Sequence, residues 1–159
     1  MSKTDFSEIL ARIPYGVSVV TMGRGGVQVE NGLTVSWMSQ VSFNPPMLMV
    51  AVDKLHYSLD LLRSTKNFCV NLLGHDQTVL AGRFAKQATT AEDKLADVAQ
   101  RTADSGAAIL TEAVAYFDCE VASMLEAGDH MVVIGRVEDA AMLNDRAPLT
   151  SASGLRYRK

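Results

Sequence analysis

The first apolar positions of the chain recur at three- and four-residue spacing. They are Phe6, Ile9, Leu10 and Ile13. This spacing places the side chains on one face of a helix, and Pro14 prevents the helix from continuing. We therefore expect a short amphipathic helix at the start of the chain.

Beyond this helix the pattern changes to that of strands. Residues 17–22 are apolar and rich in β-branched side chains, which predicts a strand. The glycine-rich residues 23–26 predict a turn toward a returning strand at 27–30. Asn31-Gly32 predicts another tight turn, and we expect residues 33–42 to form one further strand that carries several hydroxyl groups.

Strands and short helices alternate in the middle of the chain. Residues 47–52 form a continuous apolar run, which predicts a strand buried on both faces. Ser58 is expected to cap a short helix. Residues 67–73 predict another strand, and residues 78–84 predict a helix.

A charged stretch follows. Thr90 and Asp93 have the spacing of a capping box, which predicts a helix running toward Arg101. The charges along this stretch indicate a solvated face rather than a binding site.

The last third of the chain predicts two long strands. Apolar residues alternate along the first strand, at Ala113, Ala115, Phe117, Cys119, Val121 and Leu125. Asp118 and Glu120 are expected on the opposite face, and residues 130–141 form the return strand. Strands outnumber helices and follow one another in hairpin order. The pattern therefore predicts a mainly β fold, an antiparallel barrel with peripheral helices, and leaves a β-sandwich open.

Composition and charge narrow the class of protein. The length of 159 residues suits a single domain over residues 1–159, and 48% hydrophobic with 21% charged residues is typical of a globular chain. A net charge of −3 argues against nucleic acid as a partner, because phosphate binding requires a basic face. We expect no membrane association, because no apolar run reaches the ~18 residues of a spanning helix. Asp5 and Glu8 also interrupt any signal-peptide pattern.

Common catalytic and metal-binding motifs are missing. The sequence contains no P-loop, no GxGxxG fingerprint and no GxSxG motif. The three histidines, His56, His75 and His130, lack metal-ligand spacing, so no metal site is expected. Cys69 and Cys119 lie far apart in apolar runs, which favours buried thiols and a cytoplasmic location.

Four short motifs carry the functional signal. They are Asn-Gly-Leu-Thr-Val-Ser-Trp-Met-Ser-Gln-Val-Ser-Phe-Asn-Pro-Pro at 31–46, Lys-Leu-His-Tyr-Ser at 54–58, Arg-Phe-Ala at 83–85 and Gly-Asp-His at 128–130. In this order they resemble the flavin reductase-like family, the FMN-binding split barrels. The resemblance covers nearly the whole chain. It implies a Greek-key split β-barrel that forms a homodimer with flavin at or near the subunit interface.

The residue types in these motifs suit FMN, which has a dianionic phosphate and a flat ring with polar edges. Hydroxyls, N–H groups and a cation bind phosphate well. The resemblance assigns this part to Thr34, Ser36, Lys54, Tyr57 and Ser58. It assigns the ring to Ser39, Gln40, Val41 and Ser42. The hydroxyls also suit an outward-facing strand, and the lysine suits an ordinary surface position.

Four further residues are candidates for the site, and three of them have two interpretations each. Arg83 either pairs with a local carboxylate or reaches phosphate at the dimer interface. His130 either belongs to a hairpin turn or, as the resemblance implies, acts as the catalytic residue beside flavin or nicotinamide. Val35 and Trp37 stand where the family has small residues, so they are expected to reshape the cofactor pocket. Trp37 either belongs to the core or packs near the flavin.

The resemblance implies an NAD(P)H-dependent flavin reductase. Such an enzyme passes hydride from NADH or NADPH to FMN, with FAD as another possible flavin, and the reduced flavin then leaves or serves an acceptor protein. An alternative is a flavoredoxin-like electron carrier that binds FMN tightly and has no nicotinamide site. Residues 31–37 also resemble flavin-reductase modules fused to diiron flavoproteins or rubredoxins. A barrel that has lost its flavin is the third interpretation.

Overall fold

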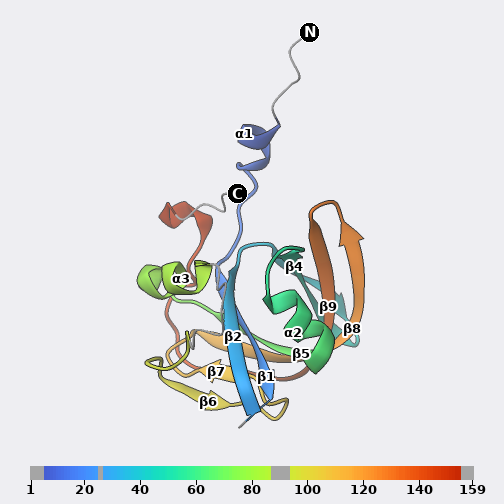
Figure 1. Cartoon of the computed structure of the whole chain (residues 1–159). Coiled ribbons are helices and arrows are strands. Elements are labelled where there is room, and N and C mark those ends of the chain that lie inside the picture. Colours follow the sequence, from blue (N-terminus) through green and yellow to red (C-terminus); the bar gives the residue numbers. More distant parts are fainter. Residues whose placement is uncertain (1–5, 25–26, 87–93, 155–159) are drawn as a thin grey trace.

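Seven strands of the chain pair into one antiparallel sheet with the order β2-β1-β5-β8-β9-β4-β3. The computed structural model describes residues 6–24, 27–86 and 94–154 (Figure 1). The strands of this sheet are β1 (Ser18–Arg24), β2 (Val27–Val35), β3 (Met38–Phe43), β4 (Pro46–Asp53), β5 (Asn67–Leu72), β8 (Ala115–Ala127) and β9 (His130–Met142). The short strands β6 (Gln100–Thr102) and β7 (Ala108–Leu110) form a separate hairpin. The helices are α1 (Ser7–Leu10), α2 (Ser58–Thr65), α3 (Thr78–Ala85) and the 3-10 turn η1 (Ser151–Ser153).

The sheet curls around an apolar core. Leu33 on β2 and Leu48 on β4 belong to one buried cluster, although their strands lie at opposite ends of the sheet order. Val20 on β1 and Val133 on β9 complete this cluster from the strands between them. Leu62 on α2 packs into the same core. The predicted β-barrel with peripheral helices is therefore confirmed.

A second core lies between α3, the residues just before β1 and the segment that follows β9. Phe84 on α3 packs with Val17, Leu73, Leu110 and Leu149. The segment that follows β9 is held to the barrel by two isolated bridges, Gly16 with Thr150 and Gly74 with Pro148. Among the described residues, no helix is long and apolar enough to span a membrane.

The predicted helix at the start of the chain is confirmed as α1, but its apolar face is exposed. Phe6, Ile9, Leu10 and Ile13 all keep more than half of their surface accessible. Figure 1 shows α1 standing clear of the barrel. Nothing in the described part of this single chain covers the apolar face.

The turn predicted at Asn31-Gly32 is wrong. Both residues lie inside β2, where they pair with Met22 and Thr21 of β1. A side chain at Gly32 would place its Cβ 2.8 Å from the ring of Phe84. Glycine is therefore used here for the close approach of α3 to the strand, and not for a turn.

The single strand predicted at 33–42 is also wrong. The chain leaves β2 after Val35 and enters β3 at Met38, so Ser36 and Trp37 connect the two edge strands of the sheet order. Hydroxyl and apolar residues alternate on both sides of this connection. The period of the sequence therefore does not reveal the break.

Two helix predictions differ from the structure. Thr90 and Asp93 lie outside the described residues, but Arg101 belongs to β6 and not to a helix. Its guanidinium lies 5.1 Å from the centre of the Tyr116 ring, which is a tertiary contact. Ser58 begins α2 but does not cap it; its hydroxyl accepts a 3.0 Å hydrogen bond from the amide of Asn31.

The two long strands predicted in the last third are confirmed, but Asp118 does not face solvent. Bulges at Asp118/Cys119 and Val121/Ser123 change the alternation along β8. The carboxylate of Asp118 is buried and accepts hydrogen bonds from the hydroxyl and the N–H of Ser105. Burial raises the pKa of Asp118. Burial also raises the pKa of both cysteine thiols, that of Cys119 to about 12, so these thiols are structural.

Gly135 should be essential for barrel packing. An added Cβ would lie 2.5 Å from the ring of Phe68, which is fully buried, and 2.9 Å from Cβ of Cys119. We expect Gly135→Ala to lower the free energy of unfolding by about 1–3 kcal/mol, which is the usual effect of overpacking. Gly82→Ala in α3 is the matched control, because nothing lies within 4 Å of its added Cβ. Chemical denaturation should show stabilisation of the control by about 0.5–1 kcal/mol. Equal stability of the two variants would contradict the packing argument.

Candidate functional site

The pairing of β4 with β9 brings several predicted site residues to one end of the barrel. Asp53 at the end of β4 lies opposite His130 at the start of β9. The N–H of Lys54 donates a 3.0 Å hydrogen bond to the carbonyl of Asp129 in the β8–β9 turn. The N–H of Ala51 donates a 2.9 Å hydrogen bond to the carbonyl of Trp37. The backbone thus holds the first, second and last sequence motifs side by side.

His130 is the most enclosed polar group at this end. Its side chain is buried, and the residue is only 4% exposed. Nδ1 lies 2.7 Å from a carboxylate oxygen of Asp129. The imidazole and the indole of Trp37 have centroids 4.7 Å apart and planes inclined by 45°. Trp37 is 45% exposed, so its ring lies between the imidazole and the surface.

Lys54 and Tyr57 flank this pair with polar groups near the surface. The ammonium of Lys54 lies 3.6 Å from the carboxylate of Glu126 on β8, and both side chains are partly exposed. Tyr57 is exposed at the start of α2. Because an exposed ion pair of this kind is weak, Lys54 can release Glu126 and bind another anion.

Ser58 occupies a buried position with a structural role. Its hydroxyl is bonded to Asn31, and its N–H donates to Nδ1 of His56 at 3.2 Å. Burial lowers the pKa of His56, and the positive charge of Lys94 lowers it further. In this chain the Ser58 side chain anchors α2 to β2 instead of facing an open site.

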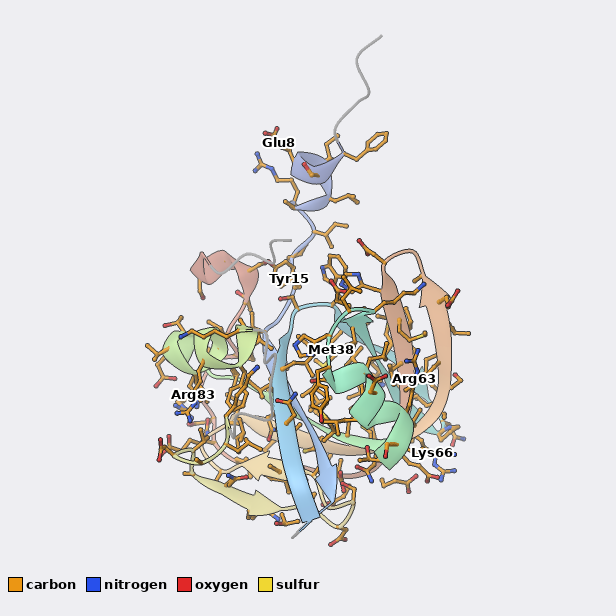
Figure 2. The ribbon with its side chains drawn as sticks, in the orientation of Figure 1. Glu8, Tyr15, Met38, Arg63, Lys66 and Arg83 are labelled. Atoms are coloured by element: carbon orange, nitrogen blue, oxygen red, sulfur yellow. The ribbon has the colours of Figure 1, made fainter. Side chains whose placement is uncertain are left out.

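Thr34 and Arg83 lie together on another side of the barrel. The hydroxyl of Thr34 donates a 2.6 Å hydrogen bond to the carbonyl of Ala81 in α3. Two residues further along α3, Arg83 is half-buried, and its guanidinium makes no hydrogen bond or ion pair with another described residue. Glu92 and Asp93, two nearby carboxylates in the sequence, lie outside the described residues, so the predicted pairing with a local carboxylate stays a prediction. Figure 2 shows Arg83 below α3, on the opposite side from the β8–β9 hairpin.

The residues predicted to line the flavin ring lie on the edge strand β3. Ser39, Gln40 and Val41 are exposed and Ser42 is half-buried. Their side-chain hydrogen bonds are local, from Ser39 to the Gln40 carbonyl and from Gln40 to the Ser42 carbonyl. β3 pairs with β4 only, so one edge of this strand carries no backbone pairing within the sheet.

Val35 and Ser36 are placed differently from each other. The side chain of Val35 is buried in the barrel core, so only its backbone is available for a ligand. Ser36 is also largely buried, but its hydroxyl makes no hydrogen bond to the part of the chain that the structure describes. Trp37 follows directly and lies at the surface. The interpretation of Trp37 as a core residue is wrong.

The structure thus separates the predicted site residues into two groups. His130, Trp37 and Lys54 meet at one end of the barrel, whereas Thr34 and Arg83 lie near α3. Asp129 was missed as a functional candidate, although its position directly before His130 in a turn was a usable signal. Within the described ranges, no cluster of three or more His, Cys, Asp or Glu residues is arranged to hold a metal ion.

Comparison with known proteins gives the same family as these motifs. The family model described as "Flavin reductase like domain" matches residues 10–157. A flavin reductase of Pseudomonas putida is 36% identical over 146 residues, covering 87% of this chain and 83% of that protein. The reductase component of a 4-nitrophenol 4-monooxygenase/4-nitrocatechol 2-monooxygenase of Rhodococcus opacus is 34% identical, covering 88% of this chain and 72% of that protein.

Several relatives are much longer than this chain, and solved structures match it over its whole length. Diflavin flavoprotein A 1 of Synechocystis is 36% identical over 84% of this chain, which spans only 23% of that protein. The NADH:FAD oxidoreductase SgcE6 of Streptomyces globisporus has a TM-score of 0.87 at 26% identity, covering 100% of this chain and 97% of that chain. The fold, the motifs and the match over residues 10–157 together show that the chain belongs to the flavin reductase like domain family.

Proposed function

We propose that this chain is an NAD(P)H-dependent flavin reductase that binds FMN. The observation that carries the proposal is the arrangement at the end of the barrel. There a buried imidazole, His130, packs against the half-exposed ring of Trp37, and the backbone N–H of Lys54 is bonded to the carbonyl of the adjacent Asp129. A planar aromatic surface beside a titratable group suits the binding of flat, polar-edged rings. The names of the flavin reductase and the NADH:FAD oxidoreductase among the similar proteins support the same activity.

The available side chains also fit the phosphate of a flavin nucleotide. Arg83 is half-buried and is not paired with any described residue, which is costly for a cation unless an anion binds it. Within the same described ranges the Ser36 hydroxyl has no hydrogen-bond partner, and the ammonium of Lys54 pairs with the exposed Glu126. Arginine binds phosphate through two parallel N–H donors. Arg83, Ser36 and Lys54 are therefore the residues that we assign to the flavin nucleotide.

The bound flavin supplies the redox chemistry: its N5 accepts a hydride from C4 of the reduced nicotinamide, which leaves as the oxidised nucleotide. The chain contributes binding and orientation. His130 acts at the reacting rings, and Trp37 limits the access of water to the imidazole. We propose FMN as the flavin and retain FAD as the alternative, because one similar structure is named an NADH:FAD oxidoreductase. NADH and NADPH are both retained as donors.

We further propose that the flavin site is completed by a second copy of the chain. Arg83 lies on α3, on the opposite side of the barrel from the β8–β9 hairpin that carries His130 (Figure 2). The exposed apolar side chains Val41 and Phe43 on β3 and the apolar face of α1 support a homodimer. The single unpaired edge of β3 is suited to such an interface.

The electrons are proposed to pass from reduced flavin to an acceptor protein. The Rhodococcus relative is named as the reductase component of a monooxygenase, which supports a partner of the oxygenase class. A cytoplasmic location is proposed because both cysteines are buried free thiols, which a reducing compartment maintains.

The phosphate assignment can be tested by comparing FMN with riboflavin, which lacks the phosphate. Wild-type protein should quench FMN fluorescence with about one flavin per chain. Because a hydrogen bond to a charged group contributes about 1.5–3 kcal/mol, Arg83→Ala should weaken FMN binding roughly ten- to hundredfold and riboflavin binding much less. Lys54→Ala, measured in the same way, tests the second cation. Arg63→Ala is the matched control, since this exposed α2 arginine pairs with Asp60. Equal weakening of both ligands would remove Arg83 from the phosphate site.

The reductase activity can be tested by anaerobic stopped-flow bleaching of bound flavin with NADH and NADPH. His130→Ala should slow bleaching roughly tenfold, equivalent to about 1.4 kcal/mol of transition-state stabilisation. FMN affinity should change much less, because the phosphate is held elsewhere. Wild-type protein that bleaches with dithionite but with neither nucleotide would support the electron-carrier alternative. If the variant is bleached at the same rate as the wild type, His130 is only a structural residue of the turn and has no role in flavin reduction.

The shared site predicts a dimer with a mass near twice 17.2 kDa by size-exclusion chromatography with light scattering. Phe43→Asp should shift the protein toward monomer and weaken FMN binding at the same time, because burying an unpaired carboxylate at an interface is costly. Phe43 is 90% exposed in the single chain, so the monomer fold should tolerate this change. Met142→Asp, at a residue that is 71% exposed at the opposite end of β9 from His130, is the matched control and should remain dimeric. A monomer that binds FMN with full affinity would exclude the shared site.

A further inference from the structure

The hairpin of β6 and β7 lies at the end of the barrel away from α1 and forms a sheet of its own (Figure 1). Buried side chains of the main sheet hold it in place. We propose that Asp118 on β8 is a proton-controlled latch for this hairpin: protonated Asp118 holds the hairpin firmly, and ionisation of Asp118 loosens it. This inference does not depend on the proposed flavin reductase function.

Strand β7 of the hairpin is anchored by neutral side chains. Asn71 on β5 accepts the N–H of Leu110 at 2.8 Å and donates to the carbonyl of Ala108 at 3.2 Å. The hydroxyl of Thr21 on β1 donates to the same carbonyl. Both Asn71 and Thr21 are fully buried. Because neither side chain titrates, this anchor does not respond to pH.

The turn of the hairpin is held by a group that can carry a charge. The hydroxyl of Ser105 donates to Oδ1 of Asp118 at 2.6 Å, and the N–H of Ser105 donates to Oδ2 at 3.2 Å. The side-chain amide of Asn67 on β5 donates to the carbonyl of Ser105 at 3.1 Å. Asp118 is only 3% exposed. The attachment of the turn therefore depends on whether this enclosed carboxyl group is ionised.

The groups that face Asp118 make its ionised form unfavourable. Asp139 on β9 is directly opposite Asp118 in the strand register, and like charges at such positions repel. Asp104 in the hairpin turn adds a second negative charge. On β5 the paired position is Cys69, whose thiol supplies no compensating positive charge. The carboxylate is thus buried among groups that disfavour its charge.

The cations near this cluster are engaged elsewhere. Nearby on the hairpin and the neighbouring strands are Arg101 on β6, Tyr116, Cys119 and Glu120 on β8, and Arg136 and Glu138 on β9. The guanidinium of Arg101 lies 5.1 Å from the centre of the Tyr116 ring. Arg136 pairs with Glu120 and Glu138 at the surface. The hydroxyl of Tyr116 donates to Asp139 at 2.6 Å, which keeps that carboxylate ionised beside Asp118.

A proton on Asp118 would also add a donor where one is missing. Oδ1 of Asn67 is buried and accepts no hydrogen bond from the residues that the structure describes. Asn67 lies two positions from Cys69, the residue paired with Asp118, so the side chains of Asn67 and Asp118 lie on the same face of the sheet. Both side chains bond to Ser105. Because an unfilled buried acceptor is costly, a carboxyl O–H in this cluster further favours the protonated form.

The burial of Asp118 determines the direction of the pH effect. Burial raises the pKa of Asp118, and the hydrogen bonds from Ser105 offset this only in part. The docked hairpin therefore binds the proton more tightly than an undocked hairpin, in which the carboxyl group meets water. Docking is strongest below the ordinary pKa of aspartate and weakens as the pH rises through the raised pKa. Each unit between these two pKa values weakens docking about tenfold.

Cys69 lies beneath the hairpin and can report whether the hairpin is docked. Its side chain packs with Ala103, Ala107 and Ile109. The other cysteine of the chain, Cys119, packs in the barrel core instead. Loosening of the hairpin should therefore expose Cys69 and leave Cys119 buried. The two thiols provide a local probe and its internal control.

The latch is tested by pulsed alkylation of the two cysteines between about pH 5 and about pH 8, with each rate divided by that of a free thiol at the same pH. In the wild type the corrected rate at Cys69 should rise roughly threefold or more over this range, and that at Cys119 should stay constant. Asp118→Asn stays neutral and keeps an acceptor for Ser105, so it should hold Cys69 at its slow rate at every pH. Glu120→Gln, which removes an exposed charge from the same strand, is the matched control and should retain the wild-type pH dependence.

Hydrogen exchange of the wild type gives a second measurement that needs no variant. Protection of the N–H groups of Ser105 and Leu110 should fall over the same pH range, while that of Val133 on β9 stays constant. The midpoint should coincide with the titration of the Asp118 carboxyl carbon followed by NMR. Equal changes at Cys69 and Cys119 would indicate global unfolding and would overturn the latch. It would also be overturned by wild-type reactivity that does not change with pH, or by a pH dependence that persists in Asp118→Asn.

Discussion

The antiparallel pairing of β9 with both β8 and β4 is the constraint on which the rest of the molecule depends. β9 lies between these two strands, and its first residue, His130, is opposite Ala127 on β8 and Asp53 on β4. The pairing of β9 with β8 and β4 closes the barrel core. It also brings the β8–β9 turn, which contains Asp129, close to the β2–β3 connection, which contains Trp37. A strand that carries the core on one face therefore also places the candidate catalytic group at its end. This explains why Gly135, in the middle of β9, has no space for a side chain against Phe68.

Enclosure distinguishes His130 from the other polar residues at the end of the barrel. The carboxylate of Asp129 contacts one nitrogen of the imidazole, and the indole of Trp37 packs against the ring. The carbonyl of Trp37 accepts the N–H of Ala51 in β4, and the carbonyl of Asp129 accepts the N–H of Lys54, the residue after β4. Such a group loses little orientational freedom when a ligand arrives. Lys54 is tied only to the exposed carboxylate of Glu126, which suits a residue that exchanges partners with a ligand.

The remaining binding residues make sense in an assembly. Arg83 is half-buried and pairs with no residue of the described ranges, β3 has one edge without a neighbouring strand in the sheet, and the apolar faces of α1 and β3 are exposed. Each of these features is unfavourable for an isolated monomer. A homodimer would relieve them together, and it would bring side chains from two barrels to each flavin.

The sequence by itself determined the barrel class, the long β8–β9 hairpin and the family, because β-branched alternation and ordered motifs are local properties that can be read along the chain. It also identified His130, Trp37 and Lys54, which the structure brings together. Tertiary structure alone decided that Asn31-Gly32 lies within a strand, that Ser58 and Asp118 are buried, and that Arg83 lies apart from His130. Each of these outcomes results from contacts with residues far away in sequence: Phe84 against Gly32, Asn31 against Ser58, Ser105 against Asp118. Local sequence propensity does not predict such contacts, because the neighbours of a strand or side chain are decided only when the strands pair into the closed sheet.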